Sequence, residues 1–139
     1  MLSNSTGKTL VGIRRVLYVH KGVVQNGAGP LELTFDDGTS VVLDAGADGE
    51  SLAVMAGSWI DPFQEPLSEE NQLFIESSGK WTAFDMATLD PFSRAIGHAI
   101  DQVDDLRSPS EKVVGTCVRL GDVVILANVD SDELLVDVA

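Results

Sequence analysis

Residues 41–54 read VVLDAGADGESLAV, and residues 123–136 read VVILANVDSDELLV. The two stretches have the same length, and their valines, alanine, turn aspartate and leucine occupy corresponding places. Each stretch follows a glycine-marked turn, at Gly38 and at Gly121, and continues an apolar and polar alternation that is typical of half-buried strands. We interpret the pair as a weak internal duplication, which predicts two copies of one β-meander.

The positions predicted to face inward agree between the two copies. They are Leu31, Phe35, Val41, Leu43, Ala45, Leu52 and Val54 in the first copy, and Val114, Val118, Val123, Ile125, Ala127, Leu134 and Val136 in the second. Because side chains alternate along a strand, a slip of one residue would move all of them to the opposite face. The agreement therefore favours duplication, although any two β-meanders share a pattern of this kind.

The pattern extends outward from the two stretches into a single domain, residues 1–139. After a flexible polar lead-in of residues 1–9, the first meander covers residues 10–56, with strands at 10–20, 31–35, 41–45 and 51–56 and an Asp-Gly turn at residues 36–38. The second meander covers residues 98–139 and begins with a strand near residues 98–106. The connector between them, residues 57–97, is rich in aromatic residues.

One main helix is expected in the connector, at about residues 68–78. Ser68 is a good N-cap residue, two glutamates follow it at the positive end of the helix dipole, and Gly79 ends the pattern. Leu73, Phe74 and Ile75 are its expected buried residues. A short strand follows at residues 81–85. Residues 91–103 fit either a longer helix or one helical turn ended by Gly97, and we favour the turn.

The predicted fold class is therefore α+β and predominantly antiparallel β. Two four-stranded β-meanders form a sandwich or open barrel, with one main helix in the connector. Whether the meanders share one sheet or form two stays open in the sequence.

Charge is the strongest compositional signal. The 139 residues carry 22 acidic side chains against nine lysines and arginines, which gives a net charge of −13. This field repels phosphate backbones and anionic lipids, so we expect neither nucleic acid nor membrane as a partner. It attracts a basic protein, although solubility alone also explains such a charge. A lone cysteine, Cys117, and the lack of an apolar leader favour a cytoplasmic, bacterial-type protein.

The connector holds most of the aromatic residues and supplies the candidate binding site. Aromatic side chains gathered in this way either line a pocket or cover an open sheet face. The candidate ligand- or partner-binding residues are Trp59, Asp61, Phe63, Trp81, Phe84, Arg94 and His98. Arg94 or His98 would be the polar group of a pocket beside Trp59 and Trp81.

Catalytic and metal-binding residues are not predicted, and no cofactor is expected. His20 and His98 lie outside any metal-ligand spacing, and the acidic turn at residues 44–55 lacks the glutamate that a calcium loop requires at its end. A dyad of Cys117 with either histidine stays open, because dyads assemble in space. Arg14 and Arg15 are expected on opposite faces of their strand, so that one of the two lies beside acidic neighbours that neutralise it. The alternative is an anion-binding patch of Arg14 or Arg15 with His20 and Lys21.

Three functional hypotheses follow. The first is a non-enzymatic protein-binding module, similar in kind to an antidote or immunity protein, that neutralises a basic partner. The second is a small-ligand-binding protein that uses the aromatic connector as its pocket. The third is an enzyme, which requires a histidine close to Cys117 or to a buried carboxylate. Exposed sheet edges would also allow a homodimer.

Overall fold

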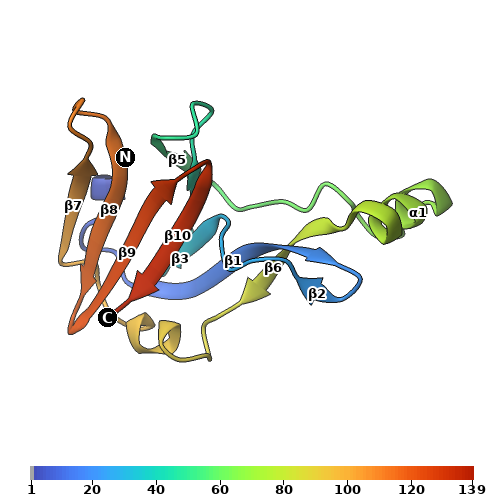
Figure 1. Cartoon of the computed structure of the whole chain (residues 1–139). Helices are drawn as coiled ribbons and strands as arrows, with labels where there is room; N and C mark the ends of the chain where they lie inside the picture. The colour runs from blue at the N-terminus through green and yellow to red at the C-terminus, as the bar shows by residue number, and fades with distance from the viewer. Residues whose placement is uncertain (1) are drawn as a thin grey trace.

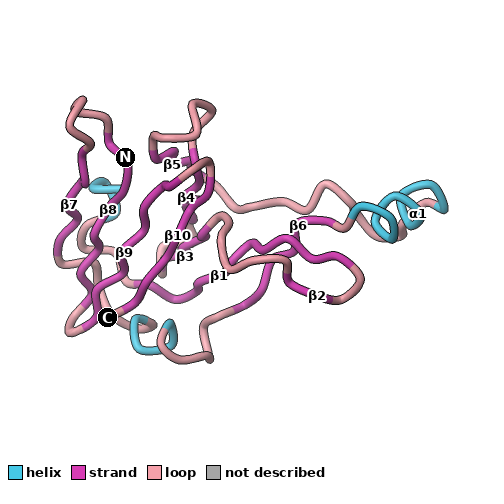
Figure 2. The backbone as a smooth tube through the Cα atoms, viewed as in Figure 1, coloured by secondary structure: helices cyan, strands magenta, loops and turns pink. Residues whose placement is uncertain are grey.

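The computed structural model describes residues 2–139 and contains two antiparallel sheets and one α-helix (Figures 1 and 2). The fold class predicted from the sequence is thereby confirmed. The first sheet has six strands and the second has four. None of the helices in residues 2–139 is both long and apolar enough to cross a membrane.

The first sheet contains the first meander. Its strands are β1 (Leu10–His20), β2 (Val23–Val24), β3 (Leu31–Phe35), β4 (Ser40–Ala45), β5 (Leu52–Ala56) and β6 (Lys80–Asp85), in the order β2-β1-β3-β4-β5 with β6 on β1. The long strand β1 pairs with β3 through its first half and with β6 through its second half. The connector therefore returns to the first sheet, and it does so through β6.

The second sheet is a four-stranded meander. Its strands are β7 (Gln102–Arg107), β8 (Val113–Leu120), β9 (Val123–Asp130) and β10 (Glu133–Val138), in the order β10-β9-β8-β7. Both sheets contribute to one hydrophobic core, where β4 contacts β9 and β10 and β5 contacts β8. Of the positions predicted to face inward, all except Val114 belong to this core. The two meanders thus lie in two separate sheets rather than in one.

The second half of β1, together with β2, β6 and α1 (Glu69–Ser78), extends away from the second sheet (Figure 1). The helix begins as predicted, because the hydroxyl of Ser68 accepts the backbone N–H of Asn71, and it ends at Gly79. The expected burial of its apolar residues is wrong: Leu73 is 62% exposed and Phe74 is 51% exposed. The helix lies at the end of the extension, where it contacts the end of β1 (Figure 1).

Two further predictions need correction. The N-terminal residues are no flexible lead-in, because Leu2–Ser5 form a 3-10 turn (η1) and the Leu2 side chain is buried in the core. The first strand of the second meander begins at Gln102 rather than near residue 98. Residues 98–100 instead form backbone hydrogen bonds with residues 7–10, beside the first sheet. The single helical turn is observed as η2 (Phe92–Ala95), followed by Gly97 at positive φ.

Candidate functional site

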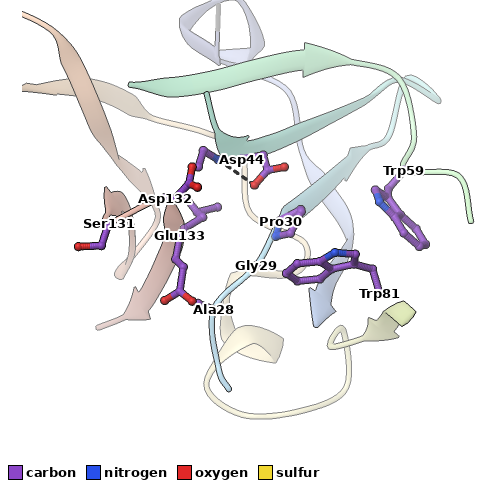
Figure 3. A pocket seen from close by; sticks show the side chains of 11 residues that line it. Ala28, Gly29, Pro30, Asp44, Trp59, Trp81, Ser131, Asp132 and Glu133 are labelled. Carbon is purple, nitrogen blue, oxygen red and sulfur yellow. Dashed lines mark hydrogen bonds between the residues drawn. The ribbon is translucent and has the colours of Figure 1, made fainter. Parts of the chain in front are cut away.

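A pocket of about 610 Å³ lies where the first sheet meets the turn between β9 and β10. Its walls come from five separate segments, and its lining residues are Ala28, Gly29, Pro30, Asp44, Ala45, Trp59, Trp81, Ser131, Asp132, Glu133 and Leu134. The segment before β3 joins the two sheets here, because the N–H of Gly29 donates to the carbonyl oxygen of Leu134 at 3.0 Å. Figure 3 shows the two tryptophans on one side and the carboxylates on the other. We call this the acidic tryptophan pocket.

The three carboxylates of the pocket have no positively charged partner. None of the ion pairs in residues 2–139 includes Asp44, Asp132 or Glu133. Burial raises the pKa of Asp44, the N–H of Ala45 partly offsets this, and the charge of Asp132 raises the pKa further. A cation that binds beside such a carboxylate stabilises its charged form.

Trp59 is held by a half-buried ion pair between Arg14 and Glu32. Both Nε and Nη2 of Arg14 donate to the Glu32 carboxylate, at 2.7 and 2.6 Å. The same carboxylate accepts the N–H of Trp59 at 2.8 Å, and Nη2 of Arg14 also donates to the Trp59 carbonyl oxygen at 3.0 Å. The ion pair therefore forms hydrogen bonds with both the N–H and the carbonyl oxygen of Trp59 and fixes the position of this residue in the pocket wall.

Trp81 is positioned by β6 and by its neighbours. Register pairs it with Tyr18 on β1, and the two rings meet edge to face with centroids 5.3 Å apart. The ring also packs against Gly29, where an added Cβ would lie 2.9 Å from the Trp81 Cζ3 atom. Trp81 nevertheless stays 44% exposed, so that its ring is open to a ligand.

A second, apolar groove of about 480 Å³ shares Trp59 and Trp81 with the acidic tryptophan pocket. Its other lining residues are Tyr18, Ile60, Pro62, Phe63, Phe74, Gly79 and Lys80. Lys80 forms an ion pair with Asp61, and its ammonium lies 5.9 Å from the centroid of the Phe63 ring. Burial raises the pKa of Asp61, but the hydrogen bonds from Lys80 and from the N–H of Phe63 lower it, and the net pKa lies below its ordinary value. We call this surface the aromatic groove.

The structure brings together some of the residues predicted for the site and separates others. Trp59 and Trp81 line both hollows, Phe63 lines the aromatic groove, and Asp61 pairs with Lys80 at its edge. Phe84 lies further along β6, opposite Arg15 of β1. Arg94, on η2, and His98, against Gly121, are exposed and line neither hollow. The pocket beside the tryptophans thus takes its polar groups from other parts of the chain.

The two neighbouring arginines of β1 have different environments. Arg14 is neutralised by Glu32, as expected, and its pKa is raised by the hydrogen bonds to that carboxylate. Arg15 is not: it is 6% exposed, and its Nη2 donates only to the carbonyl oxygens of Gly27 and Gly29. Its Nε has no partner among the described residues, and burial lowers its pKa. One of the two arginines was expected beside an acidic neighbour, and Arg14 is that one.

The residues considered for catalysis are dispersed. His20 Nε2 lies 3.2 Å from the carbonyl oxygen of Glu76, and His98 packs against Gly121. No hydrogen bond within residues 2–139 joins either histidine to Cys117, which lies half-buried on β8. In the described part of the chain, no three histidine, cysteine, aspartate or glutamate side chains gather as a metal site.

The carboxylates of the pocket were not among the residues predicted for the site. In the sequence, Asp44 and Asp132 belong to acidic turns, where aspartate is common for reasons of backbone geometry. Packing of the two sheets brings them together, and no local spacing signals that contact. The two tryptophans were the only part of this pocket with a signal of their own.

The chain matches no known protein-family model, and it matches none of the curated proteins or solved structures compared with it. Its function is therefore argued from the two hollows and their chemistry.

Proposed function

We propose that this chain is a non-enzymatic module that binds a basic protein, in the manner of an antidote or immunity protein. The observation that carries the proposal is the acidic tryptophan pocket. It combines three carboxylates without a cationic partner and two tryptophan rings, in a hollow large enough for a lysine or arginine side chain. Carboxylates attract the charge, and the faces of tryptophan rings attract cations through their quadrupole.

The charge of the whole chain supports the same partner. A net charge of −13 draws a basic protein toward the surface and speeds their encounter. Elsewhere on the surface, lysines already neutralise carboxylates, as Lys112 does for Asp48 and Glu50. Only six of the 22 acidic side chains take part in ion pairs within residues 2–139, so the pocket is set apart by the two tryptophans that line it beside its unpaired carboxylates.

The test must separate the pocket from the overall charge. We would measure binding of a fluorescein-labelled lysine- and arginine-rich peptide to the wild type and to Asp132→Asn/Glu133→Gln. The matched control, Asp122→Asn/Asp137→Asn, removes the same charge from exposed positions at the other end of the β9–β10 hairpin. Loss of about tenfold in affinity for the pocket variant alone supports the proposal. Equal losses in both variants would show that binding follows net charge only and would overturn it.

A small cationic ligand is the second candidate for the same pocket. The concave shape beside Trp59 and Trp81 is what this hypothesis requires. Affinity separates the two candidates: a free amino-acid derivative that binds as tightly as any peptide favours the small ligand. A homodimer through the end strands of the sheets, β7 and β10 among them, remains a separate proposal that light scattering tests.

A further inference from the structure

Several exposed apolar side chains lie around the tryptophans. Ile60 is 75% exposed, Phe74 is 51% exposed and Trp81 is 44% exposed, and all three line the aromatic groove. Leu73, beside Phe74 on α1, is 62% exposed. Contiguous apolar surface of this kind is typical of a place where another molecule binds.

The groove and the acidic tryptophan pocket adjoin, because Trp59 and Trp81 belong to both. Their charges differ, however. The groove carries its own cation, Lys80, which already holds the nearby carboxylate of Asp61. The pocket carries carboxylates and no lysine or arginine in its lining. A cationic side chain is therefore attracted to the pocket, whereas the groove, whose one charged pair is already neutralised, suits an apolar side chain.

We infer that the two hollows together recognise one segment of a partner protein that carries a basic side chain and, close to it, a large apolar side chain. The basic side chain enters the pocket among Asp44, Asp132 and Glu133, and the apolar one packs on Ile60 and Phe74. The tryptophan pair forms the wall between them and contacts both. This inference rests on the proposed function and adds the partner's local sequence chemistry to it.

The variants that test the groove, Ile60→Ser and Phe74→Ser, are expected to leave the fold in place. Ile60 is 75% exposed, so truncating it removes little buried surface, whereas truncating Phe74 also removes its stacking on the Phe63 ring, which makes Ile60→Ser the cleaner variant. A matched control is Val23→Ser, which truncates another apolar side chain, 61% exposed, that does not line the groove. Differences between these variants therefore report contact with a ligand.

The experiment uses dodecapeptides of alanine and serine that carry arginine and leucine with zero to four residues between them. Matched peptides replace the leucine by serine, or the arginine by citrulline, which has the same shape without the charge. Because the peptides contain no aromatic residue, the fluorescence of Trp59 and Trp81 reports binding directly.

At the best spacing, the arginine–leucine peptide is expected to bind about tenfold more tightly than the arginine–serine peptide, as burial of a leucine side chain provides. Ile60→Ser and Phe74→Ser should remove this gain and leave the arginine–serine peptide unaffected. Asp132→Asn/Glu133→Gln should remove the preference for arginine over citrulline.

Three results would overturn the inference and leave the proposed function standing. The first is equal binding of the leucine and serine peptides at every spacing. The second is an effect of Ile60→Ser no larger than that of Val23→Ser. The third is a stable dimer in light scattering that Ile60→Ser dissociates, which would make a second copy of the chain the occupant of the groove. If arginine and citrulline peptides bind equally, or no peptide binds, the proposed function fails and the inference fails with it.

Discussion

Replacing Glu32 by glutamine should destabilise the protein and loosen its pocket at the same time. The Glu32 side chain is 5% exposed and accepts hydrogen bonds from Arg14 and from the N–H of Trp59. Glutamine offers one acceptor oxygen in place of two and brings an NH₂ group against donors. Arg14 then keeps its charge without a carboxylate, and the Trp59 backbone loses an anchor.

The magnitude follows from how deeply the pair is buried. Removing one partner of a fully buried ion pair costs about 3–5 kcal/mol, because the other charge is left uncompensated. The Arg14 side chain is 35% exposed, so water can recover part of its solvation. We therefore expect Glu32→Gln to lower the free energy of unfolding by about 2 kcal/mol, which in a chain of this size is a fall in Tm of about 6–10 °C.

Urea unfolding followed by tryptophan fluorescence measures this loss, and acrylamide quenching measures the exposure of Trp59. Despite its burial, the pKa of Glu32 is lowered by Arg14 and by the N–H of Trp59. The stability that its charge contributes is thus complete above the unfolded pKa of about 4.3 and is lost as the pH falls through the lower folded value. The difference between wild type and variant should shrink over the same acidic range.

Glu50→Gln is the matched control, since Glu50 pairs with Lys112 at the surface and its side chain is 67% exposed. It should leave the unfolding midpoint unchanged. If Glu32→Gln lowers the midpoint no more than Glu50→Gln does, the half-buried pair does not hold Trp59 and the description of the pocket wall is wrong.

Three further substitutions test other parts of the structure. Asp44→Asn should raise stability at pH 7, because the folded pKa of Asp44 is raised, and the gain should disappear below about pH 4, where both states are protonated. Arg15→Met should leave stability in urea unchanged or higher, as the guanidinium is buried without a carboxylate; a loss above ~1 kcal/mol would contradict this. Gly29→Ala should cost about 3 kcal/mol, because its Cβ would lie 2.0 Å from the Val16 carbonyl oxygen, whereas Gly27→Ala meets nothing within 4 Å and should unfold like wild type.

The strands were predictable because they follow a strong local rule. Alternation places Leu31, Phe35 and Leu43 on one face, and the sheet buries that face. The helix was predictable from Ser68 and Gly79 for a similar reason, since capping depends on neighbours in the chain. What the helix packs against depends on tertiary structure, and the exposed Leu73 and Phe74 show that local pattern does not determine burial.

The site was predictable only in part. The tryptophans drew attention because the connector gathers most of the aromatic side chains, and both tryptophans line the pocket. Asp44 and Asp132 are far apart in sequence and meet because the β9–β10 turn packs against β4. Alternation along β1 predicted that Arg14 and Arg15 lie on opposite faces, but which of them meets a carboxylate depends on tertiary packing, and it is Arg14.

The indole N–H signals of the two tryptophans report most directly whether the acidic tryptophan pocket binds a cationic side chain. The chain has only two tryptophans, Trp59 and Trp81, so a ¹H–¹⁵N spectrum contains one indole N–H signal from each. Titration with N-acetyl-arginine amide should shift both signals saturably, and Asp132→Asn/Glu133→Gln should weaken the response. The uncharged analogue N-acetyl-citrulline amide should move neither signal. If the indole signals shift with neither compound, or shift equally with both, the claim that this pocket recognises positive charge is contradicted.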